Sequence, residues 1–168
     1  NADGLNIEKA LKSRDANKGS LEGYSDATTL TNDELLTLPV DVLVPAATED
    51  VITVQNAPRI QAKLIVEGAN GPTSSKADSI IYEKGVSVVP DILANAGGVT
   101  VSYFEWVQNR LGYKWTADRV NRRSDRIMKD AFENVYKVAV EYKVSLRIAA
   151  YMVAIDKVAK TYKYRGGY

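Results

Sequence analysis

Two stretches of this chain decide its fold, LIVEGANG at residues 64–71 and VVPDILANAGG at residues 88–98. Each stretch begins as a short apolar run and continues into a turn rich in Gly, Asn or Pro. Short apolar runs between turn signals are typical of strands that are buried on both faces of a sheet. Ligands of open α/β sheets lie beyond the carboxyl ends of the strands, so the polar residues of both turns are expected to meet one.

A third apolar run, at residues 40–44, precedes these two strands. Crossovers of about a dozen or more residues separate the three runs, which is the spacing of a parallel sheet with helices on its faces. Capping and turn residues predict helical segments at residues 6–18, from residue 31, at residues 56–60, and from an N-cap at Thr73 to Glu83. The predicted fold class is therefore α/β, with part of a doubly wound, Rossmann-like parallel sheet.

After Asn95 the apolar period changes from two to between three and four, which predicts a helical C-terminal region. Three helices are expected, at residues 96–110, at 116–143 with Thr116 as the cap, and at 145–164. The last helix has an apolar stripe that we expect to pack against the long helix or a neighbouring domain. The stripe consists of Ile148, Tyr151, Met152, Ile155, Val158, Ala159 and Tyr162.

The composition excludes several kinds of site. The 168 residues are 45% hydrophobic and 26% charged, as in an ordinary globular protein, and the net charge of +1 favours neither nucleic acid nor an anionic membrane. The chain has no Cys and no His, which removes thiol nucleophiles, zinc-cysteine sites and the commonest general base. No apolar run is long enough to span a membrane. We therefore expect a cytoplasmic protein that binds no metal, nucleic acid or membrane.

One face of the first C-terminal helix is a candidate binding surface. Asn95, Val99 and Ser102 are spaced i, i+4 and i+7, which places them on one face. Gly97 and Gly98 lie beside them, and each Gly in a helix costs about 0.5–1 kcal/mol relative to Ala. The pair is more easily explained by the close approach of a ligand. The alternative is a tight helix–strand contact, with Ser102 bonded back to its own helix.

Asn70 lies in the turn after the second strand, between two glycines. Taken alone, it is best explained as a residue that satisfies its own turn. Together with Asn95 at the end of the adjacent strand, it could recognise a ribose hydroxyl or an amide. The basic segment at residues 119–126 is diluted by acidic residues, which favours a solvated helix face or a subunit contact over a nucleic-acid surface.

The segments Glu67–Thr73 and Pro90–Trp106 closely resemble the glutamate dehydrogenases, and the likeness covers the whole chain. The resemblance implies the oxidative deamination of L-glutamate to 2-oxoglutarate and ammonia, with NAD or NADP as the cofactor. It implies that the nicotinamide ribose and amide of the cofactor are contacted by Ala46, Ala47, Asn70 and Asn95. It also implies that Val99 and Ser102 line the substrate pocket, with Ser102 bonded to the side-chain carboxylate of glutamate.

The resemblance also indicates which parts of such an enzyme lie outside this chain. The lysines and aspartate of acid–base catalysis, the phosphate-binding turn and the residue that selects NAD over NADP are all expected upstream, so we assign no catalytic residue here. We interpret residues 1–94 as the second half of a dinucleotide-binding domain. We interpret residues 95–168 as a helical C-terminal region that packs back toward the substrate domain. The chain alone is therefore expected to be inactive.

The ending at Arg165–Gly167 resembles the compact bacterial and archaeal hexameric enzymes, so a homo-oligomer, as a hexamer, is expected. Two alternatives stay open. One is a leucine-, valine- or phenylalanine-type dehydrogenase, against which Ser102 argues, because an apolar substrate would leave its hydroxyl buried without a partner. The other is a non-catalytic module that keeps the fold for binding or assembly.

Overall fold

The computed structural model describes residue 1 and residues 3–166, so Gly167 of the ending noted above lies outside the described residues. The chain forms two compact units, Asn1–Leu36 and Thr37–Tyr168. The boundary that we predict between residues 94 and 95 separates a cofactor-binding region from a helical region and not two compact units. It stays a prediction.

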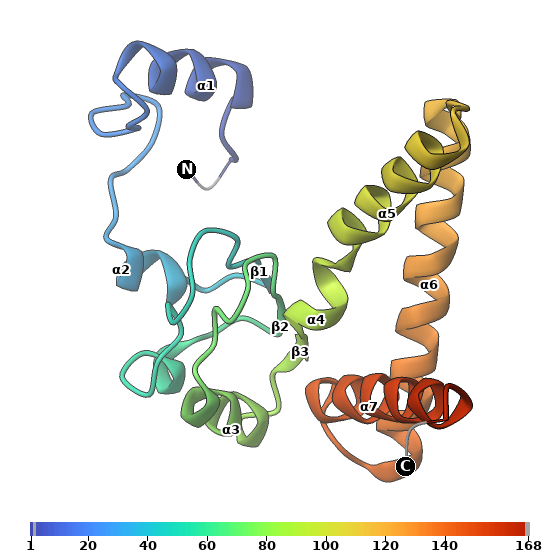
Figure 1. Cartoon of the computed structure of the whole chain (residues 1–168). Helices are drawn as coiled ribbons and strands as arrows, with labels where there is room; N and C mark the ends of the chain where they lie inside the picture. Colours follow the sequence, from blue (N-terminus) through green and yellow to red (C-terminus); the bar gives the residue numbers. More distant parts are fainter. Residues whose placement is uncertain (2, 167–168) are drawn as a thin grey trace. The chain divides into compact units, whose positions relative to one another are not determined.

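The first unit contains the helices α1 (Ile7–Ala16) and α2 (Asn32–Leu36) (Figure 1). Asn6 caps α1, because its Oδ1 accepts a hydrogen bond of 3.0 Å from the Lys9 N–H. Thr31 and Glu34 form a reciprocal capping box on α2, in which the Glu34 carboxylate accepts from the Thr31 N–H at 2.8 Å. The Glu34 N–H donates back to the Thr31 hydroxyl at 3.2 Å. Both predicted helix starts are confirmed.

The second unit contains a parallel sheet of β1 (Val42–Leu43), β2 (Leu64–Val66) and β3 (Ser87–Val89), in that spatial order. The 3-10 helix η1 (Ala57–Arg59) lies between β1 and β2 in the chain, and α3 (Ser75–Glu83) lies between β2 and β3. Ile65 of the central strand is fully buried, as expected for a strand covered on both faces. The predicted α/β class and the three parallel strands are confirmed, although each strand is shorter than predicted.

The predicted cap of α3 is wrong by one residue, because the N-cap is Ser74 and not Thr73. Thr73 is held in an extended conformation by a bridge to the buried Ile52. The Ile52 N–H donates to the Pro72 carbonyl at 2.8 Å, and the Ser74 N–H donates to the Ile52 carbonyl at 2.9 Å. The Thr73 hydroxyl is left buried, with no hydrogen-bond partner among the described residues.

Four helices follow β3, and they are α4 (Asp91–Ala94), α5 (Ala96–Leu111), α6 (Ala117–Tyr142) and α7 (Leu146–Tyr164). The three longer helices match the predictions, and Thr116 caps α6 by accepting a bond of 3.3 Å from the Arg119 N–H. The short α4 was not predicted, because four residues are too few to show a helical period. The helices α5 and α6 form a hairpin, and α7 packs across the end of α6 (Figure 1).

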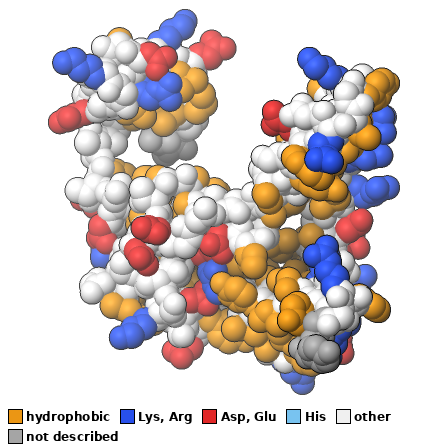
Figure 2. All heavy atoms as spheres, viewed as in Figure 1, with side chains coloured by type: hydrophobic (Ala, Val, Ile, Leu, Met, Phe, Trp, Pro, Cys, Tyr) orange, Lys and Arg blue, Asp and Glu red, His pale blue; other side chains and the backbone are white. Residues whose placement is uncertain are grey.

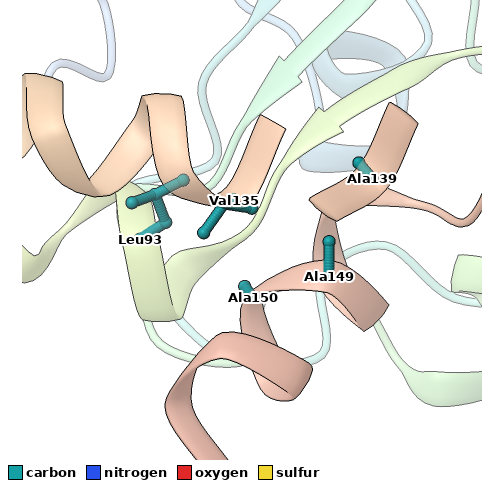
Figure 3. Close-up of a cluster of buried hydrophobic side chains, with 5 residues drawn as sticks. All are labelled: Leu93, Val135, Ala139, Ala149 and Ala150. Carbon is teal, nitrogen blue, oxygen red and sulfur yellow. The ribbon is translucent and has the colours of Figure 1, made fainter. Parts of the chain in front are cut away.

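The core of this helical region is built around small residues. Leu93 of α4, Val135 and Ala139 of α6, and Ala149 and Ala150 of α7 point toward one another (Figure 3). Ala149 has no exposed surface, and its short side chain lets α6 and α7 approach closely. The core therefore ties α7 to the segment that follows β3.

The expectation that the apolar stripe of α7 packs against the long helix is wrong. Ile155 is 64% exposed and Val158 is 69% exposed, because the alanine face of α7 fills the contact with α6 instead. Figure 2 shows hydrophobic side chains gathered at the surface over α7. Packing against a neighbouring domain, the other option, stays a prediction. Among the described residues, no helix is both long and apolar enough to cross a membrane.

Candidate functional site

The candidate site begins where the turn after β2 meets the end of β1. The Gly68 and Ala69 N–H groups both donate to the Pro45 carbonyl, at 3.0 and 2.9 Å. A Cβ atom on Gly68 would lie 3.0 Å from the Cβ of Ala46, which is tighter than nine in ten real Cβ contacts. The close approach of Ala46 therefore favours glycine at position 68, and the two hydrogen bonds hold the turn against the end of β1.

A shallow hollow of about 330 Å³ lies at these strand ends. It is lined by the segment after β1 and the turn after β2, namely Ala47, Thr48, Glu49, Ala69 and Asn70. Two predicted site residues, Ala47 and Asn70, thus face one hollow at the carboxyl edge of the sheet. This is the position at which ligands of open α/β sheets bind.

Asn70 and Asn95 are in direct contact. The Asn95 Nδ2 donates to the Asn70 Oδ1 at 2.6 Å and to the Gly68 carbonyl at 3.4 Å. This pairing leaves the Asn70 Nδ2 and the Asn95 Oδ1 without a further hydrogen bond to any described residue. One donor and one acceptor side by side are complementary to a carboxamide or a sugar hydroxyl.

Asn95 is also the N-cap residue of α5, and Val99 and Ser102 lie on the helix face that starts from it. Val99 is 70% exposed, and Ser102 is exposed as well. The nearby Thr100 hydroxyl donates back to the Ala96 carbonyl at 2.8 Å, whereas the Ser102 hydroxyl makes no hydrogen bond within the described residues. This contradicts the alternative in which Ser102 is bonded back to its own helix.

The two glycines of α5 have different surroundings. A Cβ on Gly97 would lie 4.0 Å from the sulfur of Met128, which is an ordinary packing distance. A Cβ on Gly98 would meet no described atom within 4 Å. The space beside Gly98 is therefore open, and no helix–strand contact among the described residues explains this glycine.

Sequence reasoning missed a cluster of charged residues around Glu67, the residue that precedes the turn after β2. Arg147, in the first turn of α7, bonds Glu67 Oε1 at 2.7 Å and Asp78 Oδ1 at 2.8 Å. It also lies 3.5 Å from Asp91 Oδ1. Glu67, the residue after β2, has no exposed surface, and Asp91 begins α4. We call Arg147, Glu67, Asp78 and Asp91 the Arg147 cluster.

Burial alone would lower the pKa of Arg147, but the hydrogen bonds and charges of Glu67 and Asp78 outweigh burial and raise that pKa. A raised pKa in the folded state stabilises the fold at every pH below the unfolded value, which for Arg is above about 12. The cluster therefore keeps its stabilising charge over the whole working range of pH. Removing one partner of such a buried pair typically costs about 3–5 kcal/mol.

The basic segment of α6 has a structural explanation. The guanidinium groups of Arg119 and Arg123 lie 4.6 and 4.5 Å from the ring centroid of Trp115. Arg122 pairs with Asp118 at 2.8 Å, one turn earlier on the same exposed face. These contacts support the interpretation as a solvated helix face.

Comparisons with known proteins identify the family of this chain. The family model of the glutamate/leucine/phenylalanine/valine dehydrogenases matches residues 1–166. The chain belongs to this dehydrogenase family. The glutamate dehydrogenase of Thermotoga maritima is 50% identical over 168 residues, which are 100% of this chain and 40% of that protein. The catabolic NAD-specific glutamate dehydrogenase RocG of Bacillus subtilis is 48% identical over 166 residues, which are 99% of this chain and 39% of that protein.

Solved structures of the same dehydrogenase family share the fold. The hetero-hexameric glutamate dehydrogenase of Thermus thermophilus superposes with a TM-score of 0.89 at 31% identity, covering 98% of this chain and 38% of that chain. The glutamate dehydrogenase of Peptoniphilus asaccharolyticus gives a TM-score of 0.78 at 41% identity, covering 98% of this chain and 36% of that chain. The chain therefore spans about 40% of the length of the curated dehydrogenases that it matches.

Proposed function

We propose that the whole protein is a glutamate dehydrogenase that uses NAD or NADP. In this reaction L-glutamate loses a hydride from its α-carbon, and water then replaces the amino group to give 2-oxoglutarate and ammonia. The bond between Asn70 and Asn95 carries the proposal, because it forms one donor–acceptor pair between the turn after β2 and the junction of α4 and α5. Family membership and the names of the related enzymes support it.

Asn70, which lines the hollow, and its partner Asn95 fit the nicotinamide end of the cofactor. The Asn70 Nδ2 and the Asn95 Oδ1 have no hydrogen-bond partner among the described residues, and together they match an amide or a ribose hydroxyl. We propose that Ala46 and Ala47 form the wall beside them, since small side chains leave room at the strand end. When bound, the cofactor supplies the hydride acceptor. The name of the Bacillus subtilis relative, NAD-specific, favours NAD over NADP.

We propose that Val99 and Ser102 line the glutamate pocket. Ser102 has a hydroxyl with no partner among the described residues, and it shares a helix face with Asn95. A hydroxyl can donate to the distal carboxylate of glutamate, and a hydrogen bond to a charged group contributes about 1.5–3 kcal/mol. Val99 supplies apolar contact for the methylene groups of the substrate.

Substrate turnover by the purified whole protein tests the proposal. We expect reduction of NAD or NADP with L-glutamate, formation of ammonia, and much slower turnover of leucine and phenylalanine. Faster turnover of leucine or phenylalanine would favour another member of the family. No turnover of any of the three would favour a non-catalytic module. The 168-residue chain alone serves as a control and is expected to be inactive, since we assign it no group for proton transfer.

We also propose a homo-hexamer and a cytoplasmic location, both from the resemblance and the composition given above. The hetero-hexameric Thermus thermophilus relative makes six subunits a reasonable expectation. Sedimentation of the whole protein and fractionation of the source cells test the two proposals.

A further inference from the structure

We propose that Arg147 is a positioning residue for the cofactor site, because it holds the turn that presents Asn70. The inference rests on the proposed function only in taking Asn70 as a cofactor contact. Arg147 lies on α7 and does not line the hollow at the strand ends. It must therefore act through the residues that it holds.

The first connection runs through Glu67, which directly precedes the turn at residues 68–71. Glu67 Oε1 accepts from Arg147 at 2.7 Å, and Glu67 Oε2 accepts from the Asp91 N–H at 2.9 Å. The Glu67 N–H also donates to the Val89 carbonyl at 3.1 Å. The start of the turn is thus tied to α7, to α4 and to the end of β3.

The second connection runs through Asp91 to the other end of the turn. Asp91 Oδ2 accepts from the Gly71 N–H at 2.8 Å, while Asp91 Oδ1 faces Arg147. Gly71 has a φ of +56°, a left-handed conformation that a fixed partner helps to hold. Asn70 therefore lies between two anchor points, Glu67 and Gly71, which both lead to Arg147.

The arrangement needs an arginine and not merely a positive charge. Arg147 faces three carboxylates, each with a different nitrogen, Nη2 toward Glu67, Nε toward Asp78 and Nη1 toward Asp91. A lysine has a single ammonium group and cannot reproduce this planar fork. We expect Arg147→Lys to keep the charge but to lose the contact with Asp91, and with it the support of the turn at residues 68–71.

The experiment compares Arg147→Lys with Arg122→Lys in the whole protein. Arg122 makes one exposed ion pair, with Asp118, away from the turn. Titration calorimetry with the reduced dinucleotide should show binding weakened about tenfold or more by Arg147→Lys, with no change for Arg122→Lys. The KM for glutamate at saturating cofactor should stay within about twofold of the unmodified protein.

Stability must be separated from positioning. The triple variant Glu67→Gln, Asp78→Asn and Arg147→Met removes the arginine charge together with the two carboxylates that it bonds at 2.7 and 2.8 Å. In other proteins the removal of a whole buried ion pair or triad is often neutral for stability, and the Gln oxygen can still accept from the Asp91 N–H. We expect this variant to unfold near the unmodified temperature and still to bind the dinucleotide weakly. If this variant regained both the stability and the dinucleotide affinity of the unmodified protein, Arg147 would have a structural role only, and the proposal would be overturned.

Hydrogen exchange separates this inference from the proposed function. If the unmodified protein bound neither NADH nor NADPH, the proposed function would fail, but the hold on the turn could still be measured. The Gly71 amide donates to Asp91, so the peptide covering residues 68–71 should exchange faster in Arg147→Lys than in Arg122→Lys. Equal exchange in the two variants would overturn the role of Arg147.

Discussion

Ser102 differs from its neighbour Thr100 in having a hydroxyl with no partner in the described chain. In the whole protein we expect Ser102→Ala to lower kcat/KM for glutamate by about one to two orders of magnitude, because a bond to the distal carboxylate is lost. Activity on norvaline, which has no such carboxylate, should fall less or rise. Steady-state kinetics with both substrates on the same variant provides the measurement.

Thr100→Ala is the matched control for this prediction, since it removes a hydroxyl from the same helix turn that only bonds back to Ala96. Thr100→Ala should change the activity on glutamate and the activity on norvaline by the same factor. Equal losses on glutamate and norvaline in Ser102→Ala would mean that Ser102 is a structural residue.

The contact between the turn after β2 and the end of β1 depends on the absence of a side chain at Gly68. We expect Gly68→Ala to destabilise the whole protein by about 1–3 kcal/mol, because the new methyl group would overlap Ala46 and neither strand end can move freely. Thermal or denaturant unfolding measures the change.

Gly98→Ala provides the opposite case on α5. Its methyl group would meet open space, so the gain in helix propensity should stabilise the free protein by about 0.5–1 kcal/mol. If a ligand approaches Gly98, this variant should also bind cofactor or substrate more weakly. Stabilisation with unchanged binding of both would show that the open space is not part of the site.

The capping box of α2 should respond to pH. Hydrogen bonds from the Thr31 backbone and hydroxyl lower the pKa of Glu34 below its ordinary value. A lowered pKa in the folded state means that the stabilisation is present above the unfolded value and is lost as the pH falls through the folded one. The NMR shift of the Thr31 amide should therefore titrate with an acidic midpoint, and in Glu34→Gln this titration should vanish.

Local features were predictable from the sequence and distant ones were not. Asn6 and Thr116 act as caps within one helical turn, and the apolar runs were visible as strands. Arg147 and Glu67 are separated by 80 residues, and no period or motif connects them. The exposure of the α7 stripe was not predictable, because pattern alone does not tell that Ala149 and Ala150 fill the contact with α6. Packing of the stripe against a neighbouring domain, the other option, stays a prediction. Spacing and turn composition predicted Asn70, Asn95, Val99 and Ser102 as site residues, whereas only the resemblance pointed to Ala46 and Ala47. The structure adds the bond between Asn70 and Asn95.

At the scale of the whole molecule, the apolar stripe of α7 stays largely exposed in this chain, although the apolar face of a helix is normally buried. We expect it to be covered in the whole protein, by another domain or another subunit. Val158→Ser should then lower the free energy of unfolding by about 1.5–3 kcal/mol, the value of a buried Val side chain. The neighbouring Lys157→Ser should change it by less than about 0.5 kcal/mol.

Sedimentation of the same two variants shows which surface is covered. Dissociation of Val158→Ser into smaller species would place the stripe at a subunit interface, while an intact but less stable hexamer would place it against a domain of the same chain. Equal unfolding and equal sedimentation of the two variants would mean that the stripe is open to solvent.

The α5–α6 hairpin contains both tryptophans of the chain, Trp106 and Trp115. Trp106 follows Ser102 by one helical turn, and its ring stacks on Tyr103 with a centroid distance of 5.8 Å. Trp106 is 55% exposed, so its emission depends on how much water surrounds that face of α5. Indole fluorescence from this chain therefore arises entirely from one hairpin, and quenching by a ligand beside Ser102 could be followed in real time without attaching a dye.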